Sequence, residues 1–231
     1  MSRNLCAIGH ALMVLLLTAS AASATECSLA AAYQLRLLSQ QGGSPLSPVL
    51  GAAYTRLLDD PNGSVLQMDA EVRVAPRVSL IGSLGACDAG YGGKKKPIFG
   101  GTLGLQLFSM PETPLSVVLQ ATAGRYEGEA TTESWTEYTF PVMLAVGYQA
   151  NERVAVHAGP LLQHDTWTST FTGGTEVDDS ETGIGAVFGL EAGIGARASV
   201  NASLTALHFG GDETSDGDTL KSGAVRLSFR L

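Results

Sequence analysis

The chain has 231 residues, of which 45% are hydrophobic and only 16% are charged, and its formal net charge is -8. A chain this acidic is a poor ligand for nucleic acid, because binding there requires clustered lysines and arginines that neutralise phosphates. The apolar content excludes a disordered chain, and after the first 25 residues no apolar run is long enough for a membrane-spanning helix.

The start of the chain has the three parts of a secretory signal. Arg3 supplies a positive charge, Ala11 to Leu17 supply an apolar core, and Ala22-Ser23-Ala24 supplies small residues at a cleavage site. We therefore expect residues 1–24 to be an export signal that is cleaved before Thr25.

Apolar and polar residues alternate with period two from Ser64 onward, which is typical of strands whose two faces meet different surroundings. The clearest case runs from Gly183 to Ala196, where large apolar residues share one face and glycines share the other. We expect ten strands, although eight or twelve would also fit the pattern. They are predicted near residues 66–74, 78–86, 99–107, 115–121, 138–148, 154–162, 183–196, 200–206 and 224–231, after a first strand ending at Leu57.

Short and long connections alternate along the chain. Tight connections are expected at 75–77, 111–114, 150–152 and around Arg197, and longer polar ones at 59–63, 88–96, 127–134, 172–181 and 211–218. An up-and-down barrel has this regularity, with turns on one rim and loops on the other. Tyr138 and Tyr148 share one face and would lie about 25 Å apart along a tilted strand, which is the height of a lipid-facing band. Two ordinary surface tyrosines would give the same spacing. The pattern predicts an all-β transmembrane, antiparallel up-and-down β-barrel.

The stretch EYTFPVMLAVGYQANERVAVHAGPLLQH, from Glu137 to His164, resembles the central hairpin of small bacterial outer-membrane β-barrel proteins. The general pattern extends from Ser47 to Leu231, although chains of that family usually end in an aromatic residue and here Phe229 lies two positions earlier. The resemblance implies a barrel over residues 46–231, located in the bacterial outer membrane. It implies outer-membrane lipid, lipopolysaccharide and the outer-membrane assembly machinery as partners, and no nucleic acid.

Strand parity places charged residues of both signs on the face opposite the apolar one. In a narrow barrel such charges tend to pair, because burial of an unpaired charge is unfavourable. The expected lumen charges are Asp69, Glu71, Arg73, Glu191, Arg226 and Arg230. Among the long loops, only the run Lys94, Lys95 and Lys96 is basic and could face lipopolysaccharide phosphate; a solvated loop is the alternative.

No residue set predicts catalysis. His157 is expected to point inward, whereas His164 and His208 point outward, and His164 and Asp165 are strand neighbours that must face opposite sides. A general base needs a carboxylate within hydrogen-bond reach. The acidic loops 176–181 and 212–218 lack the spacing of a calcium loop. We therefore expect no enzyme activity, no cofactor and no metal site.

The chain has three cysteines, of which Cys6 would be lost with the export signal. The other two, Cys27 and Cys87, form a candidate disulfide, because exported proteins retain such bonds. The bond would hold residues 25–45 as an arm inside the lumen. Free cysteines, or a helix or strand outside the lumen, are the alternatives.

These observations favour a non-enzymatic outer-membrane barrel with an envelope-structural or surface-interaction role. A narrow porin-like channel for small solutes is the main alternative, and a lipid-modifying enzyme is a third. A soluble lipocalin-like barrel would need an apolar interior and a polar exterior.

Overall fold

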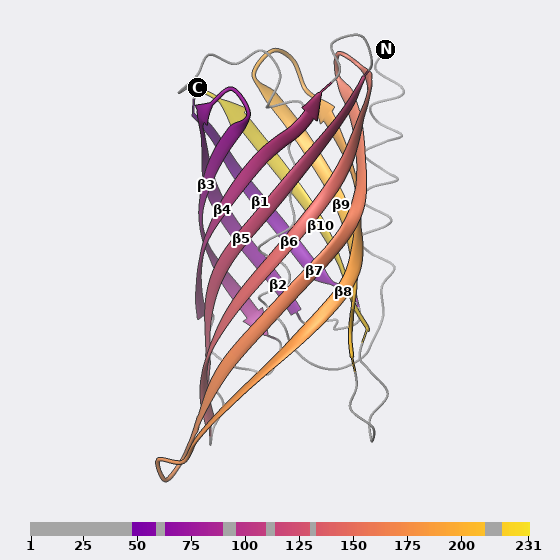
Figure 1. The fold of residues 1–231 in the computed structure, drawn as a ribbon. Helices are drawn as coiled ribbons and strands as arrows, with labels where there is room; N and C mark the ends of the chain where they lie inside the picture. The colour runs from indigo at the N-terminus through magenta and orange to yellow at the C-terminus, as the bar shows by residue number, and fades with distance from the viewer. Residues whose placement is uncertain (1–47, 59–62, 90–95, 110–113, 130–132, 211–218) are drawn as a thin grey trace.

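A computed structural model describes residues 48–58, 63–89, 96–109, 114–129, 133–210 and 219–231. Ten antiparallel strands form one closed barrel in which each strand pairs with its sequence neighbours and β1 pairs with β10 (Figure 1). The strands are β1 (Val49–Leu57), β2 (Gly63–Ala75), β3 (Val78–Ala89), β4 (Lys96–Ser109), β5 (Leu115–Glu129), β6 (Glu133–Asn151), β7 (Val154–Phe171), β8 (Glu176–Gly193), β9 (Ala198–Phe209) and β10 (Thr219–Arg230). The predicted fold class and strand number are confirmed.

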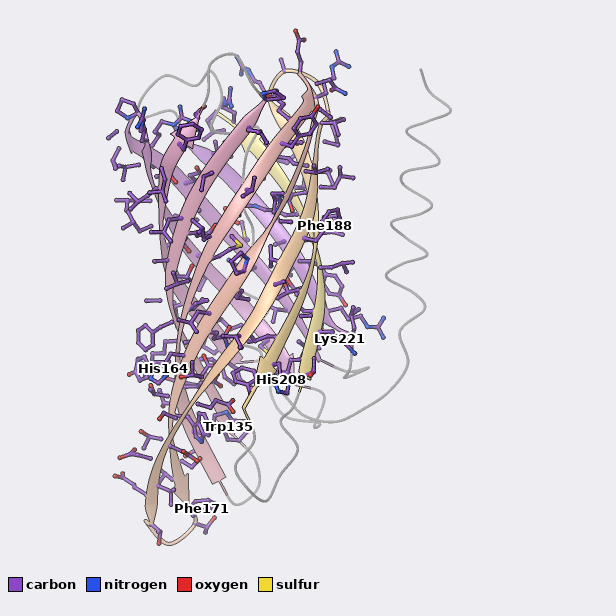
Figure 2. All side chains as sticks on the ribbon, turned by 45° about the vertical axis from the view of Figure 1, so that its right-hand side comes forward. Trp135, His164, Phe171, Phe188, His208 and Lys221 are labelled. Atoms are coloured by element: carbon purple, nitrogen blue, oxygen red, sulfur yellow. The ribbon has the colours of Figure 1, made fainter. Side chains whose placement is uncertain are left out.

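The apolar face of the strands lies outside the barrel. Large apolar side chains such as Met68, Ile184 and Phe188 are 67%, 65% and 54% exposed, and Phe188 points away from the barrel in Figure 2. Tyr138 and Tyr148 also face outward, at 43% and 46% exposure. An apolar exterior suits lipid and is the reverse of what a lipocalin-like barrel requires.

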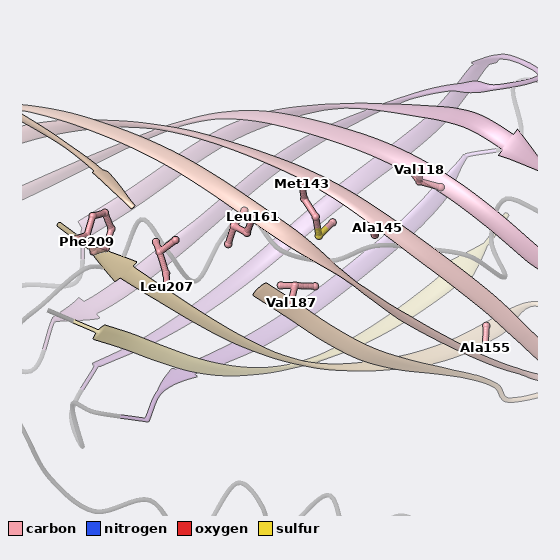
Figure 3. Close-up of a cluster of buried hydrophobic side chains, with 8 residues drawn as sticks. All are labelled: Val118, Met143, Ala145, Ala155, Leu161, Val187, Leu207 and Phe209. Atoms are coloured by element: carbon pink, nitrogen blue, oxygen red, sulfur yellow. The ribbon is translucent and has the colours of Figure 1, made fainter. Parts of the chain in front are cut away.

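Small and apolar residues fill much of the interior. A buried cluster joins β5 to β9 and consists of Val118, Met143, Ala145, Ala155, Leu161, Val187, Leu207 and Phe209 (Figure 3). A second cluster of Val65, Cys87, Ile98 and Tyr126 packs against Trp135. The interior is therefore packed with side chains along several strands.

Two glycines allow neighbouring strands to approach closely. A Cβ at Gly159 would lie 2.0 Å from the carbonyl oxygen of Leu144, and a Cβ at Gly185 would lie 2.0 Å from that of Ala206. No side chain fits at either distance, so the backbone path of β7 and β8 depends on glycine at these positions.

Strands β5 to β8 continue well beyond the others at the loop end. β6 has 19 residues and β7 and β8 have 18 each, whereas β1 has 9. The hairpin of β7 and β8 closes at residues 172–175, where Gly173 and Gly174 have positive φ, and it projects past the rest of the barrel in Figure 1. The prediction of long loops at 127–134 and 172–181 is therefore wrong, because most of these residues belong to strands β5, β6 and β8.

The expected export signal and the segment 25–45 lie outside the described residues, and their boundaries stay predictions. Within the described part of the chain, no helix is long and apolar enough to cross a membrane.

Candidate functional site

The polar interior contains a buried ion pair close to the seam where the barrel closes. Arg226 on β10 and Asp69 on β2 form a salt bridge, and both side chains are 2% exposed. β1 lies between these two strands, and a Cβ at its Gly51 would lie 2.4 Å from Nη2 of Arg226 and 2.8 Å from Oδ1 of Asp69. Because Gly51 has no side chain, the ion pair can cross β1 on the inner face.

The other expected lumen charges lie near the turn end of their strands. Glu71 and Glu191 are buried, at 5% and 1% exposure, and Ser199 Oγ donates a hydrogen bond of 3.0 Å to Glu191 Oε1. Arg73 and Arg230 are half-buried and make polar interactions. The structure thus places the six expected lumen charges inside the barrel. Of these six, Asp69 and Arg226 form a direct ion pair.

A second polar group lies inside the barrel toward the loop end. Glu137 and Thr139 on β6 are 6% and 4% exposed, and Gln163 and Asp165 on β7 are 0% exposed. Gln163 Nε2 donates a hydrogen bond of 2.5 Å to Asp165 Oδ2. Sequence reasoning missed this group, because a polar residue that faces a lumen has the same period-two position as one that faces water.

Some buried polar atoms of the described interior have no hydrogen-bond partner. They include both ring nitrogens of His157 and Nε of Arg226. Buried polar atoms are normally paired with protein or ordered water. Ordered water would satisfy these atoms.

The histidines do not form a catalytic arrangement in the described structure. His164 Nδ1 lies 2.9 Å from Thr182 Oγ1, and His208 Nδ1 lies 3.0 Å from Thr219 Oγ1. Both rings are on the outside, whereas Asp165 faces inward, in agreement with strand parity. Among the described residues, no three His, Cys, Asp or Glu side chains are grouped closely enough to hold a metal ion.

Basic side chains of β5, β7, β9 and β10 lie on the outside of the barrel near the loop end. Figure 2 shows His164, His208 and Lys221 at a similar height on the outer surface. The Arg125 guanidinium carbon lies 5.9 Å from the centre of the Tyr138 ring. Arg125 Nη2 forms an ion pair with Oε1 of the exposed Glu127 at 2.5 Å. We call Arg125, His164, His208 and Lys221 the outer belt.

Two expected features fall largely outside the described residues. Lys94 and Lys95 are not described, and only the backbone of Lys96 is, at the start of β4. Cys87 is buried, at 2% exposure, and is disulfide-bonded. Cys27, the expected partner, lies outside the described residues, so that pairing stays a prediction.

Comparison with known proteins gives distant structural similarities. No curated protein matches the chain. Similar solved structures include Ail, the attachment invasion locus protein of Yersinia pestis, at 13% identity over 80% of this chain and 97% of that chain, with a TM-score of 0.39. Neisserial surface protein A has 12% identity over 83% and 100%, with a TM-score of 0.43. The outer membrane protease OmpT of Escherichia coli has 9% identity over 83% and 100%, with a TM-score of 0.46.

The family comparison covers almost the whole chain. The model of the outer membrane protein beta-barrel domain matches residues 11–230. This match agrees with the closed ten-stranded barrel and with its apolar exterior. The chain belongs to the outer membrane protein beta-barrel domain family, a family of the bacterial outer membrane.

Proposed function

We propose that this protein is a non-enzymatic outer-membrane barrel that acts in surface interaction, with the projecting β7–β8 hairpin as its contact element. The observation that carries the proposal is the unequal pairing of β8. Its ladder with β7 runs from Glu176 to Ala192, whereas its ladder with β9 begins only at Gly183. Residues 176–182 therefore form a strand edge that no described strand covers.

The backbone geometry of this edge suits strand addition. Phe171 N donates a hydrogen bond to Thr175 O across the hairpin turn at 2.9 Å. Because hydrogen-bonded pairs alternate along an antiparallel ladder, odd-numbered residues of β8 bond to β7. The Ser180 N–H donates to Asp179 Oδ1 at 2.7 Å. The N–H and C=O groups of Glu176 and Asp178 consequently point away from β7 as open edge groups. An extended peptide could pair with them as an added strand.

The charge of the edge selects the partner. Glu176, Asp178, Asp179 and Glu181 supply four carboxylates within seven residues. Such charges disfavour pairing between two copies of the same edge. They favour an extended segment rich in lysine or arginine from another protein, and the exposed threonines and serines of the hairpin add hydrogen-bonding groups.

Lipopolysaccharide is the proposed neighbour of the barrel wall. The outer belt of Arg125, His164, His208 and Lys221 faces outward near the loop end, where lipid phosphates would lie. Arginine and lysine near such phosphates form charge-assisted hydrogen bonds. This belt adds to the expected contact by Lys94, Lys95 and Lys96. Insertion into the membrane would require the outer-membrane assembly machinery.

Two variants test the hairpin. In the first, residues 168–178 are replaced by Asn-Gly, which joins the hydrogen-bonded pair Trp167 and Asp179 through a two-residue turn. In the second, Asp178→Pro removes one edge N–H without removing a backbone bond to β7; Asp178→Ala keeps that N–H and is the matched control. The probe is an alternating Lys-Val peptide, compared with a copy N-methylated at every second residue. We expect binding to the unmethylated peptide only, and both test variants should lose it. N-methylation removes backbone N–H groups but keeps the lysine charges. Equal binding of both peptides would therefore mean that charge attraction alone accounts for binding, and it would refute strand addition.

The packed interior supports a closed barrel rather than a pore. Gln163, Asp165 and Leu207 are 0% exposed, and the Asp69 and Arg226 side chains, which pair on the inner face of β1, are each 2% exposed. The unpartnered polar atoms described above favour the second candidate, a narrow hydrated channel. Planar-bilayer recordings separate the two: we expect no steady single-channel current, and a reproducible conductance would establish the channel.

A further inference from the structure

The turn end of the barrel carries an excess of positive side chains, although the chain as a whole has a formal net charge of -8. Within six positions of the strand ends at the turns, the described side chains include six arginines and four acids. Such an excess attracts anions to this end of the molecule. The arginines are Arg73, Arg77, Arg153, Arg197, Arg226 and Arg230, and the acids are Asp69, Glu71, Glu152 and Glu191.

A pocket opens at this end beside the turn that joins β2 to β3. Its polar lining consists of Arg73, Arg77, Ser79 and Gln106, and Gly104 forms part of its wall. The pocket has about 190 Å³ of empty space, part of which is open to solvent. Among the described residues that line it, none is acidic. The lining therefore offers two guanidinium groups to a ligand and no carboxylate.

The strand register brings these residues together on the inner face of the barrel. Arg73 on β2 is directly opposite Ser79 on β3, and Ser79 is directly opposite Gly104 on β4. Directly opposed residues have Cβ atoms about 4.5 to 5.5 Å apart. Ser79 is 6% exposed, and a Cβ at Gly104 would lie 2.5 Å from Oγ of Ser79. The absence of a side chain at Gly104 therefore leaves room for the Ser79 hydroxyl.

The turn between β2 and β3 fixes the position of Arg77. Pro76 and Arg77 form a two-residue connection between the strands, and the proline ring restricts φ at the first of these residues. On the other side, Gln106 N donates a hydrogen bond of 2.8 Å to Arg77 O. The backbone of Arg77 is thus held by β4, while its side chain is exposed at the edge of the pocket.

From this geometry we propose that the pocket binds the phosphate group of a soluble molecule, with Arg73 and Arg77 donating hydrogen bonds to its oxygens. Arginine forms paired hydrogen bonds with phosphate, and the Ser79 hydroxyl and the Gln106 amide supply further donors. A guanidinium has five N–H donors, so the polar interaction that Arg73 already makes leaves others for the ligand. A phosphate monoester has a charge of about -1.5 to -2 at pH 7 and therefore complements two arginines better than a carboxylate does.

The position of the pocket indicates where such a ligand comes from. In outer-membrane barrels the short turns lie on the periplasmic side, so the pocket is on that side. Ser79 and Gly104 face the lumen and not the lipid. The ligand therefore enters through the mouth of the barrel from the periplasm. This site lies at the opposite end from the β8 edge and does not depend on the proposed surface interaction.

The test is a phosphorus-31 NMR titration of the full chain, folded in detergent micelles at pH 8, with inorganic phosphate as the probe. We expect saturable binding that sulfate displaces and that chloride at the same ionic strength does not. Arg77→Gln should weaken phosphate binding by about tenfold or more, because hydrogen bonds to a charged group are lost.

Arg197→Gln is the matched control. Arg197 is also an exposed turn arginine, and its carbonyl oxygen accepts a 2.8 Å hydrogen bond from Arg230 N on the next strand, but it does not line the pocket. The control removes the same charge from the same end of the barrel and should leave the affinity for phosphate nearly unchanged. Gly104→Ala tests the pocket in a second way, because its methyl group would displace the Ser79 hydroxyl, and it should weaken binding several-fold.

Three results would overturn the proposal. The first is absence of saturable phosphate binding, and the second is equal loss of binding in Arg77→Gln and Arg197→Gln, which would mean that only diffuse attraction acts. The third is displacement of phosphate by phosphatidylglycerol added to the micelles, which would assign the pocket to a lipid headgroup. Migration before and after boiling reports whether each variant is folded. If Gly104→Ala does not fold, Arg77→Gln decides, because it changes an exposed side chain and keeps the backbone hydrogen bond to β4.

Discussion

Gly51 is expected to control the stability of the barrel through the ion pair that crosses it. A Cβ at this position would lie 2.4 Å from Nη2 of Arg226, whereas an undistorted contact needs about 3.4 Å. In Gly51→Ala the guanidinium must therefore move by about 1 Å. Arg226 and Asp69 are both 2% exposed, so the arginine has little room to move without leaving its partner.

The expected magnitude follows from two opposing effects. Separation of a buried ion pair costs about 3 to 5 kcal/mol, because a charge is left without its partner. Replacement of a strand glycine by alanine returns about 0.5 to 1 kcal/mol through lower backbone entropy in the unfolded chain. We therefore expect Gly51→Ala to lower the free energy of unfolding by about 2 to 4 kcal/mol.

The assay is equilibrium urea unfolding of the purified barrel in lipid vesicles, followed by tryptophan fluorescence. Gly82→Ala on β3 is the control, because a Cβ there meets no atom within 4 Å and should leave stability unchanged or slightly higher. In a background where Asp69 and Arg226 are both replaced by apolar residues, Gly51→Ala should lose most of its effect. Equal unfolding midpoints for Gly51→Ala and Gly82→Ala would refute the reasoning.

Three further predictions concern packing, lipid and the disulfide. Gly185→Ala should prevent folding or destabilise the barrel strongly, because its Cβ would meet a backbone oxygen of β9 at 2.0 Å; boiled and unboiled samples on a gel would show the loss of folded protein. Leu144→Arg, midway between the two outer tyrosines of β6, should cost about 2 to 4 kcal/mol in vesicles, whereas Thr136→Arg beyond the tyrosines should have little effect. A non-reduced digest should contain Cys87 linked to Cys27, and a Cys87 peptide of unaltered mass would contradict this pairing.

The sequence predicted the barrel well because lipid and lumen are different surroundings. In β6, Tyr138, Leu144 and Tyr148 face outward, while Met143 and Ala145 between them are 2% and 0% exposed. This contrast is what creates the period-two pattern, so the strand number and the inside and outside faces could be predicted from it.

Beyond the membrane the same pattern disappears, and the prediction failed there. Val177 and its neighbours in β8 are exposed on both faces, so no contrast between the faces distinguishes a strand from a loop. The second polar group, inside the barrel toward the loop end, was missed for a related reason. Asp165 is separated by one residue from Gln163, and only the register that sets it opposite Thr139 and beside Glu181 shows that these residues meet.

The ion pair over Gly51 also bears on how the barrel finds its correct closure. β1 is the shortest strand and joins the two ends of the sheet, since it pairs with both β2 and β10. A shift of β1 by one residue would turn its outer face inward. A shift by two would preserve the faces but would place Val49 or Ala53 under the guanidinium in place of Gly51. Either error disturbs the Arg226–Asp69 pair, so the register of β1 that leaves Gly51 between the two side chains is the one in which both buried charges are paired.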